Sequence, residues 1–130
     1  MNTENKLSVF APTGLLKLLI LEYVSAKPLS GSEILNKISK ESNGLWIPSP
    51  GSIYPIIKTL SKNGLLLEIY NTDKNVKKYV TTSKGKSFLV LEKSNLNNSL
   101  KRNLTVSLLL ANLTDYKISK KIENVLNSMS

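Results

Sequence analysis

The sequence contains no cysteine and no histidine among its 130 residues. Disulfide bonds, thiolate nucleophiles and zinc sites built from Cys or His ligands are therefore excluded. The most common general base of enzymes is also absent. The nine Asp and Glu residues are scattered and show no paired arrangement. We therefore expect no catalytic site, metal or cofactor, and a small enzyme is the least favoured alternative.

The chain also lacks an apolar run long enough to cross a bilayer. Its most apolar stretch, residues 15–26, is interrupted by Lys17 and Glu22. The segment before it holds Glu4 beside Lys6 in place of the positive region that opens a secretory signal. We therefore expect a buried helix over this stretch and a cytoplasmic protein with no membrane partner.

Acidic residues are few compared with basic ones. Eighteen Lys and Arg against nine Asp and Glu give a formal charge of +9 and a sequence pI near 9.8. Residues 58–102 hold nine Lys and one Arg against three acids, so this segment supplies +7 of the +9. Positive charge concentrated in this way favours a polyanionic partner, nucleic acid before an anionic membrane.

Three helices are predicted in the first half of the chain, over residues 15–26, 31–42 and 49–62. The second has the clearest start, because Ser30 followed three residues later by Glu33 forms a capping box. The third opens with a serine cap and a proline at the first helical position, where the missing N–H costs nothing. Each helix carries apolar residues at helical spacing, so the three can share a core.

A hairpin and two further helices complete the predicted order. Apolar and polar residues alternate on both sides of the polar segment 71–75, which predicts two strands joined by a turn. A long helix then starts near Ser83 and bends or breaks at 112–114, before a short amphipathic helix. The predicted fold is mostly α with a small β-hairpin wing (α+β). It comprises a polar tail (1–12), a winged helix-turn-helix (13–82) and a C-terminal helical dimerisation region (83–130).

In a winged helix-turn-helix the third helix enters the DNA major groove and the hairpin reaches along the backbone or into the minor groove. Here the third helix, 49–62, opens with small residues that let the backbone approach DNA, and helix N-termini suit phosphates. The wing, 71–78, holds the densest positive run of the chain. The predicted DNA-binding residues are Ser49, Gly51, Ser52, Tyr54, Lys58, Lys62, Lys74, Lys77 and Lys78.

Four stretches of the chain resemble the PadR family of transcriptional regulators. They are LSGSEIL at 29–35, GLWIPSPGSIYP at 44–55, LSKNGLL at 60–66 and KYVTTSKG at 78–85. The resemblance spans roughly residues 14–90. It implies a winged-helix repressor that binds a palindromic operator of double-stranded DNA as a homodimer, through the recognition helix 49–62 and the wing.

The chain departs from the family pattern in a short wing tip and in its use of lysine almost to the exclusion of arginine. Lysine binds phosphate as a point charge but lacks the fork that guanine recognition favours. Phosphate contacts are therefore expected to dominate the affinity, with few base contacts and DNA shape setting the sequence preference.

The long C-terminal helix is too apolar for a three-helix domain to cover alone, and dimerisation is the simplest explanation. The leucines predicted to contact the partner lie at helical spacing without a strict heptad, at Leu89, Leu96, Leu100, Leu104 and Leu108.

Three alternatives stay open. The winged helix could be a protein-interaction module without specific DNA binding. The last helix opposes apolar residues to lysines, a pattern also found in helices that lie on membrane surfaces. In some PadR-like proteins an aromatic residue of the dimer helix sandwiches a flat hydrophobic effector. Trp46, the single Trp, precedes the recognition helix, so a packing role is favoured for it. A small hydrophobic effector is possible but unsupported.

Overall fold

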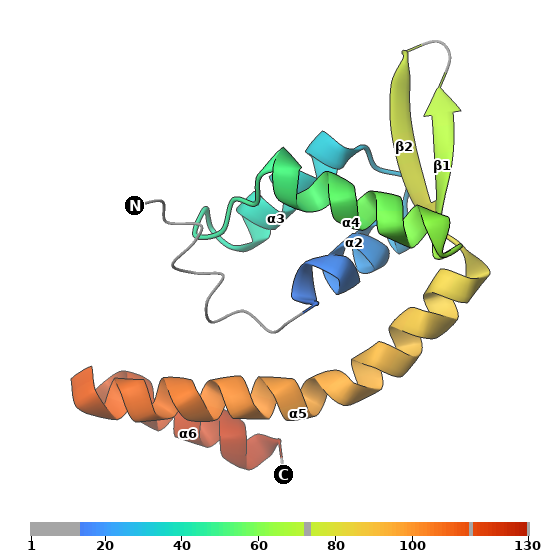
Figure 1. The fold of residues 1–130 in the computed structure, drawn as a ribbon. Coiled ribbons are helices and arrows are strands. Elements are labelled where there is room, and N and C mark those ends of the chain that lie inside the picture. Colours follow the sequence, from blue (N-terminus) through green and yellow to red (C-terminus); the bar gives the residue numbers. More distant parts are fainter. Residues whose placement is uncertain (1–13, 72–73, 115, 130) are drawn as a thin grey trace. The chain divides into compact units, whose positions relative to one another are not determined.

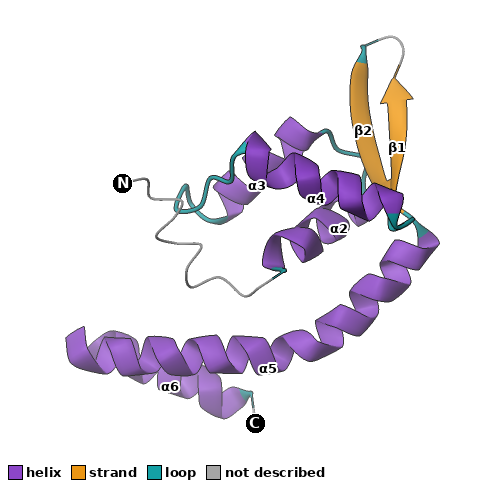
Figure 2. Cartoon of the chain, viewed as in Figure 1, coloured by secondary structure: helices purple, strands orange, loops and turns teal. Residues whose placement is uncertain are grey.

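The computed structural model describes residues 14–71, 74–114 and 116–129 (Figures 1 and 2). The predicted tail, 1–12, lies outside these residues. The observed elements follow the predicted order, so the expected fold, mostly α with a small β-hairpin wing, is confirmed. They are α2 (Leu15–Ala26), α3 (Gly31–Glu41), α4 (Pro50–Lys62), β1 (Leu66–Asn71), β2 (Val76–Thr81), α5 (Ser83–Thr114) and α6 (Tyr116–Ser128).

Local sequence signals define the starts of the two helices that follow α2. Ser30 Oγ accepts the backbone N–H of Glu33 at 3.2 Å, and Glu33 Oε1 accepts the backbone N–H of Ser30 at 3.0 Å, which confirms the capping box. Ser49 caps α4 by accepting the backbone N–H of Ser52 at 3.2 Å, and Pro50 is the first helical residue. α3 ends at Glu41, one residue earlier than predicted.

The core of the first compact unit, residues 1–92, lies between α2, α3, α4 and the base of the hairpin. Its most deeply buried side chains include Ile20, Leu21, Val24, Ile34, Ile38, Ile53 and Leu60. Trp46 packs against this core, as favoured. The first turns of α5 join it as well: Phe88 packs on the cluster and Leu89 is only 5% exposed. Leu89 is thus largely covered within this unit, and its predicted contact with a partner chain stays a prediction.

The wing is a two-stranded antiparallel sheet in which Leu66 lies opposite Thr81 and Asn71 opposite Val76. A backbone bridge extends it on the other edge of β2. Tyr79 N donates to Leu29 O at 2.9 Å, and Leu29 N donates to Tyr79 O at 3.3 Å. The base of β2 is thus anchored to the segment that joins α2 and α3.

The end of α4 is joined by hydrogen bonds to the start of α5. Thr82 Oγ1 donates to Gly64 O at 2.6 Å and accepts the Gly85 N–H at 3.0 Å, while Lys84 Nζ donates to Asn63 O at 3.0 Å. The close approach requires glycine at position 85, since a Cβ there would lie 2.2 Å from the carbonyl oxygen of Leu65. The two helices are therefore fixed to each other where they meet.

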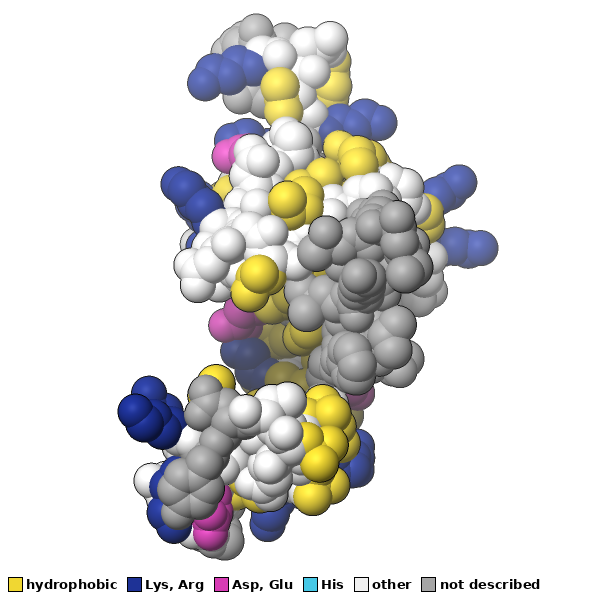
Figure 3. All heavy atoms as spheres, turned by 90° about the vertical axis from the view of Figure 1, so that its left-hand side faces the viewer, with side chains coloured by type: hydrophobic (Ala, Val, Ile, Leu, Met, Phe, Trp, Pro, Cys, Tyr) yellow, Lys and Arg dark blue, Asp and Glu magenta, His cyan; other side chains and the backbone are white. Residues whose placement is uncertain are grey.

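The second compact unit, residues 93–130, contains the rest of α5 and α6. α5 ends at Thr114 and α6 begins at Tyr116, so the predicted break at 112–114 falls on the last residues of α5. The buried residues among those described in this unit are small, Ala111 and Ser119. Its larger apolar side chains are mostly exposed or half-buried, and yellow side chains gather on this lower part of Figure 3. In the described part of the chain, no helix is long and apolar enough to cross a membrane.

The two units divide between Glu92 and Lys93, within α5. The boundary predicted between the winged helix-turn-helix and the dimerisation region, between residues 82 and 83, lies at the start of α5. The compact unit extends further because the side chains of Phe88 and Leu89 belong to its core. The separate dimerisation role of residues 83–130 stays a prediction.

Candidate nucleic-acid interface

α4 presents one apolar face to the core and one polar face to solvent. Ile53, Ile57 and Leu60 are buried, as their spacing predicted. The exposed face includes five of the predicted DNA-binding residues, Gly51, Ser52, Tyr54, Lys58 and Lys62. Ser49, the sixth, is half-buried at the cap. The structure thus brings these six residues together on one helix and its cap.

The exposed face of α4 is free of acidic residues. Residues 50–62 contain no Asp or Glu, and the first turn is capped by a neutral serine. The partial positive charge of the helix N-terminus is therefore not neutralised by a carboxylate of its own helix. Lys58 and Lys62 add full positive charges, and within the described residues neither forms an ion pair with an acid. This surface suits a phosphate backbone.

Tyr54 combines packing with exposure. Its side chain is 45% exposed, and its ring lies beside Gly31 at the start of α3. A Cβ at Gly31 would lie 2.5 Å from the Tyr54 hydroxyl and 2.7 Å from the ring. Gly31 therefore leaves room for the Tyr54 ring because it has no side chain. The predicted phosphate contact of Tyr54 stays a prediction.

The three wing lysines differ in their surroundings. Lys74 is exposed at the turn. Lys77 Nζ lies 3.6 Å from Glu68 Oε1, a cross-strand pair within the hairpin. Lys78 Nζ lies 3.5 Å from Glu33 Oε1, on α3. The wing is therefore less strongly positive than its lysine content predicted. Figure 3 shows dark-blue basic side chains projecting from the wing at the top of the view.

Sequence reasoning missed the two acids that face the wing lysines. Glu68 could have been found from the hairpin register, because it lies diagonally across from Lys77 on the same face of the sheet. Glu33 was identified only as a cap. Its position beside Lys78 depends on how α3 packs against β2, for which the local sequence carries no signal.

Three helices, an anchored hairpin and an acid-free exposed recognition helix define a winged helix-turn-helix protein of the DNA-binding class. The model of the PadR-like family of transcriptional regulators matches residues 20–90, so the chain belongs to this family. It is accordingly a DNA-binding transcriptional regulator and not an enzyme. No curated protein matches the chain.

Solved structures agree with this assignment. A putative transcriptional regulator from Thermoplasma acidophilum is 27% identical, with a TM-score of 0.60 over 75% of this chain and 91% of its own. A PadR-like transcriptional regulator from Bacillus cereus is also 27% identical, with a TM-score of 0.57 over 78% and 93%. A transcriptional regulator from Clostridium thermocellum, 21% identical, shares the fold with a TM-score of 0.62 over 66% and 86%.

Proposed function

We propose that the protein is a repressor that binds a palindromic operator of double-stranded DNA as a homodimer. The observation that carries the proposal is the exposed, acid-free face of α4. In this proposal the first half of α4 lies in the major groove and the lysines follow the phosphates. The proposed contacts are Ser49, Gly51, Ser52, Tyr54, Lys58, Lys62, Lys74 and Lys77.

Homodimer formation is supported by an apolar stripe on α5, which we define as Val106, Leu109, Leu110 and Leu113. These residues follow the i, i+3, i+4, i+7 spacing of one helix face, and all four are exposed. Of the leucines predicted earlier, Leu100 is exposed, whereas Leu96, Leu104 and Leu108 are half-buried. We therefore assign the stripe the larger share of the dimer contact. Exposed apolar area of this kind marks an interaction surface.

A palindromic site follows from a symmetric dimer, since each protomer would bind one half of it. Repression is proposed from the family, because a dimer bound across a promoter excludes other proteins from it. A regulator must reach chromosomal DNA, so we propose a cytoplasmic location. On the apolar side of α6, Ile122 and Leu126 are half-buried whereas Ile118 and Val125 are exposed, so liposome co-sedimentation is the test of membrane-surface attachment.

The test is a titration of the protein into labelled duplex DNA from its own upstream region and into scrambled duplex, at several salt concentrations. We expect two chains per native duplex, tighter binding than to scrambled DNA, and a steep loss of affinity with salt. Replacement of Lys58 or Lys74 by Ala should each reduce the salt slope by about 0.9 per protomer, the value for one phosphate contact.

Lys121→Ala is the matched control, because it removes the same charge from the exposed surface of α6. It should leave the slope unchanged. If Lys58→Ala and Lys74→Ala resemble this control, the assigned DNA surface is wrong. Equal binding to native and scrambled duplex would instead favour the protein-interaction module.

A further inference from the structure

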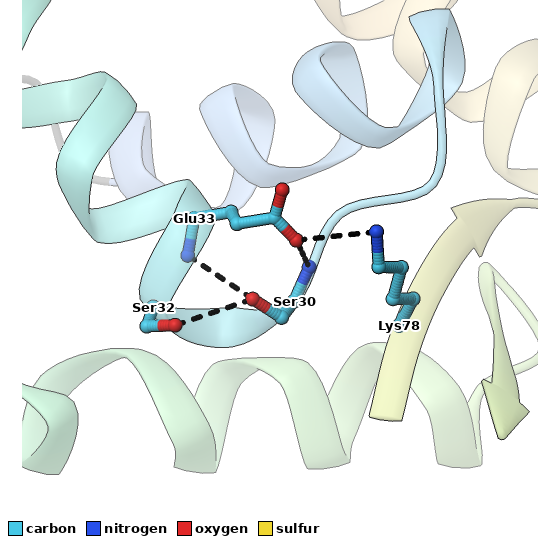
Figure 4. Close-up of polar contacts among 4 residues, drawn as sticks. All are labelled: Ser30, Ser32, Glu33 and Lys78. Carbon is cyan, nitrogen blue, oxygen red and sulfur yellow. Dashed lines mark hydrogen bonds and ion pairs between the residues drawn. The ribbon is translucent and has the colours of Figure 1, made fainter. Parts of the chain in front are cut away.

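The carboxylate that caps α3 also holds a lysine of the wing (Figure 4). Glu33 Oε1 accepts the Ser30 backbone N–H at 3.0 Å and lies 3.5 Å from Lys78 Nζ. The same oxygen therefore serves two partners, one from the α3 N-terminus and one from β2. Ser30 Oγ, which accepts the Glu33 N–H, also lies 3.2 Å from Ser32 Oγ. The acid is held in place by backbone geometry and not by the lysine alone.

Glu33 stays ionised at neutral pH. The hydrogen bond from the Ser30 backbone holds the pKa of Glu33 below its ordinary value, with a further contribution from the charge of Lys78, and these outweigh partial burial. A phosphate that approached Lys78 would therefore meet a fixed negative charge next to it. Like charges at such short range repel, and the repulsion is strongest close to the protein surface.

The surroundings of Lys78 differ from those of Lys77. The Lys77 side chain is 60% exposed and its partner, Glu68, has no role at a helix start. The Lys78 side chain is 36% exposed and lines a shallow groove with Lys27, Pro28 and Ile69. Its backbone neighbour Tyr79 forms the bridge to Leu29. The ion pair between Lys78 and Glu33 therefore lies beside the backbone bridge between Tyr79 and Leu29. Both connect the wing to the start of α3 and the residues just before it.

We propose that Glu33 withholds Lys78 from DNA phosphates and uses it to anchor the wing to the start of α3. The part of this proposal that concerns DNA rests on the proposed function, whereas the anchor does not. Lys78 then serves as a positioning residue for the wing, and Lys74 and Lys77 are the wing lysines that neutralise phosphates. Removing the charge of Glu33 releases Lys78 and adds one phosphate contact per protomer.

The experiment compares Glu33→Gln, Lys78→Gln and the double variant with the unmodified protein in salt-dependent DNA titrations. Glutamine at the third helical position preserves the capping box, so the fold is retained. We expect Glu33→Gln to steepen the salt slope by about 0.9 per protomer. Lys78→Gln alone should leave the slope unchanged, and the double variant should return it to the original value.

Lys74→Gln is the control for a lysine that contacts phosphate, and it should flatten the slope in both the original and the Glu33→Gln background. The proposal is overturned if Lys78→Gln alone flattens the slope as much as Lys74→Gln. It is also overturned if Glu33→Gln leaves the salt slope unchanged.

A measurement without DNA separates the anchor from the DNA surface. Limited acylation of the free protein, followed by mass spectrometry, should modify Lys78 more slowly than Lys74, and Glu33→Gln should raise the Lys78 rate at least twofold. Equal rates at the two lysines in the unmodified protein would overturn the anchor. Slow modification of Lys78 together with no effect of Lys74→Gln on DNA binding would leave the anchor in place and reject the proposed DNA surface.

Discussion

The two compact units of the chain differ in where they place their apolar residues. Up to Glu92, one set of large apolar side chains forms a core whose most deeply buried members are inaccessible to solvent, while others, such as Leu45 and Val90, are exposed. From Lys93 onward, the buried residues among those described are Ala111 and Ser119, while leucines such as Leu113 are exposed. The first unit thus has an apolar core of its own. The second has no comparable core among its described residues, and its exposed apolar surface is of the kind that marks an interaction site.

The largest expected effect is on stability, and it comes from comparing a Leu→Ala substitution in the first unit with one in the second. Leu21 is 0% exposed and Leu113 is 83% exposed. Leu21→Ala should lower the free energy of unfolding by about 2–5 kcal/mol, because it removes buried methyl groups and leaves a cavity. Leu113→Ala should change the stability of the monomer by less than about 0.5 kcal/mol, as surface substitutions usually do.

Urea denaturation at several protein concentrations checks this pair. Leu21→Ala should destabilise the protein at every concentration. Leu113→Ala should weaken only the dependence on concentration, and sedimentation should show more monomer. If Leu113→Ala leaves the monomer–dimer equilibrium unchanged, the apolar stripe is not the dimer contact.

A smaller effect is expected where α4 meets α5. Gly85→Ala places a Cβ 2.2 Å from the Leu65 carbonyl oxygen, a backbone atom that cannot rotate away. Relieving this overlap should cost about 1–3 kcal/mol of stability. Gly51→Ala is the matched control, because the nearest atom to its Cβ would be Ser49 Oγ at an ordinary 3.7 Å. It should be neutral or stabilise the helix by up to about 1 kcal/mol. Equal melting temperatures for the two variants would contradict the close approach.

A third prediction concerns the contact between α2 and α3. The hydroxyl of Tyr23 donates to Glu41 Oε2 at 2.5 Å, and Lys37 lies over the Tyr23 ring. Tyr23→Phe should cost about 1 kcal/mol, the usual net value of such a hydrogen bond. Tyr54→Phe, at an exposed tyrosine, should change stability by less than about 0.5 kcal/mol. Chemical denaturation of the two variants measures their free energies of unfolding, and equal losses would contradict the Tyr23–Glu41 hydrogen bond.

The same contact predicts an alkaline dependence. Burial, together with the hydrogen bond and negative charge of Glu41, raises the pKa of Tyr23 well above its ordinary value of 10. The folded state therefore keeps a proton that the unfolded state loses, so stability falls as pH rises above about 10. Burial raises the pKa of Tyr79 as well, so Tyr23→Phe should reduce this fall without abolishing it. An unchanged fall would show that Tyr23 does not contribute.

The features that could be predicted from the sequence are those set by a few neighbouring residues. The Ser30 capping box and the Ser49 cap with Pro50 are complete within one helical turn, and the alternation around the hairpin turn is equally local. The position of Leu89 was not predictable in this way. Helical spacing shows that a leucine shares an apolar face, but it does not distinguish the chain's own core from a partner.

The partners of the wing lysines were beyond local prediction for a related reason. The distance of 3.5 Å between Lys78 and Glu33 results from the packing of β2 beside α3, after the bridge between Leu29 and Tyr79 has formed. A count of the wing lysines therefore gave no sign of the acids that lie beside Lys77 and Lys78. Only the tertiary structure distinguishes Lys74 from Lys78.

The smallest effect distinguishes the two acids that face the wing. The lowered pKa of Glu33 means that its contribution to stability is present above the ordinary value of 4.5 and is lost as pH falls below it. Glu33→Gln should therefore make the unfolding midpoint in urea less sensitive to acid between neutral pH and about pH 3. Glu68→Gln leaves Glu33 and its hydrogen bond from Ser30 in place, so the part of the acid sensitivity that is due to Glu33 should be retained. If the two variants show the same pH profile, the hydrogen bond from Ser30 to Glu33 does not contribute to the acid sensitivity.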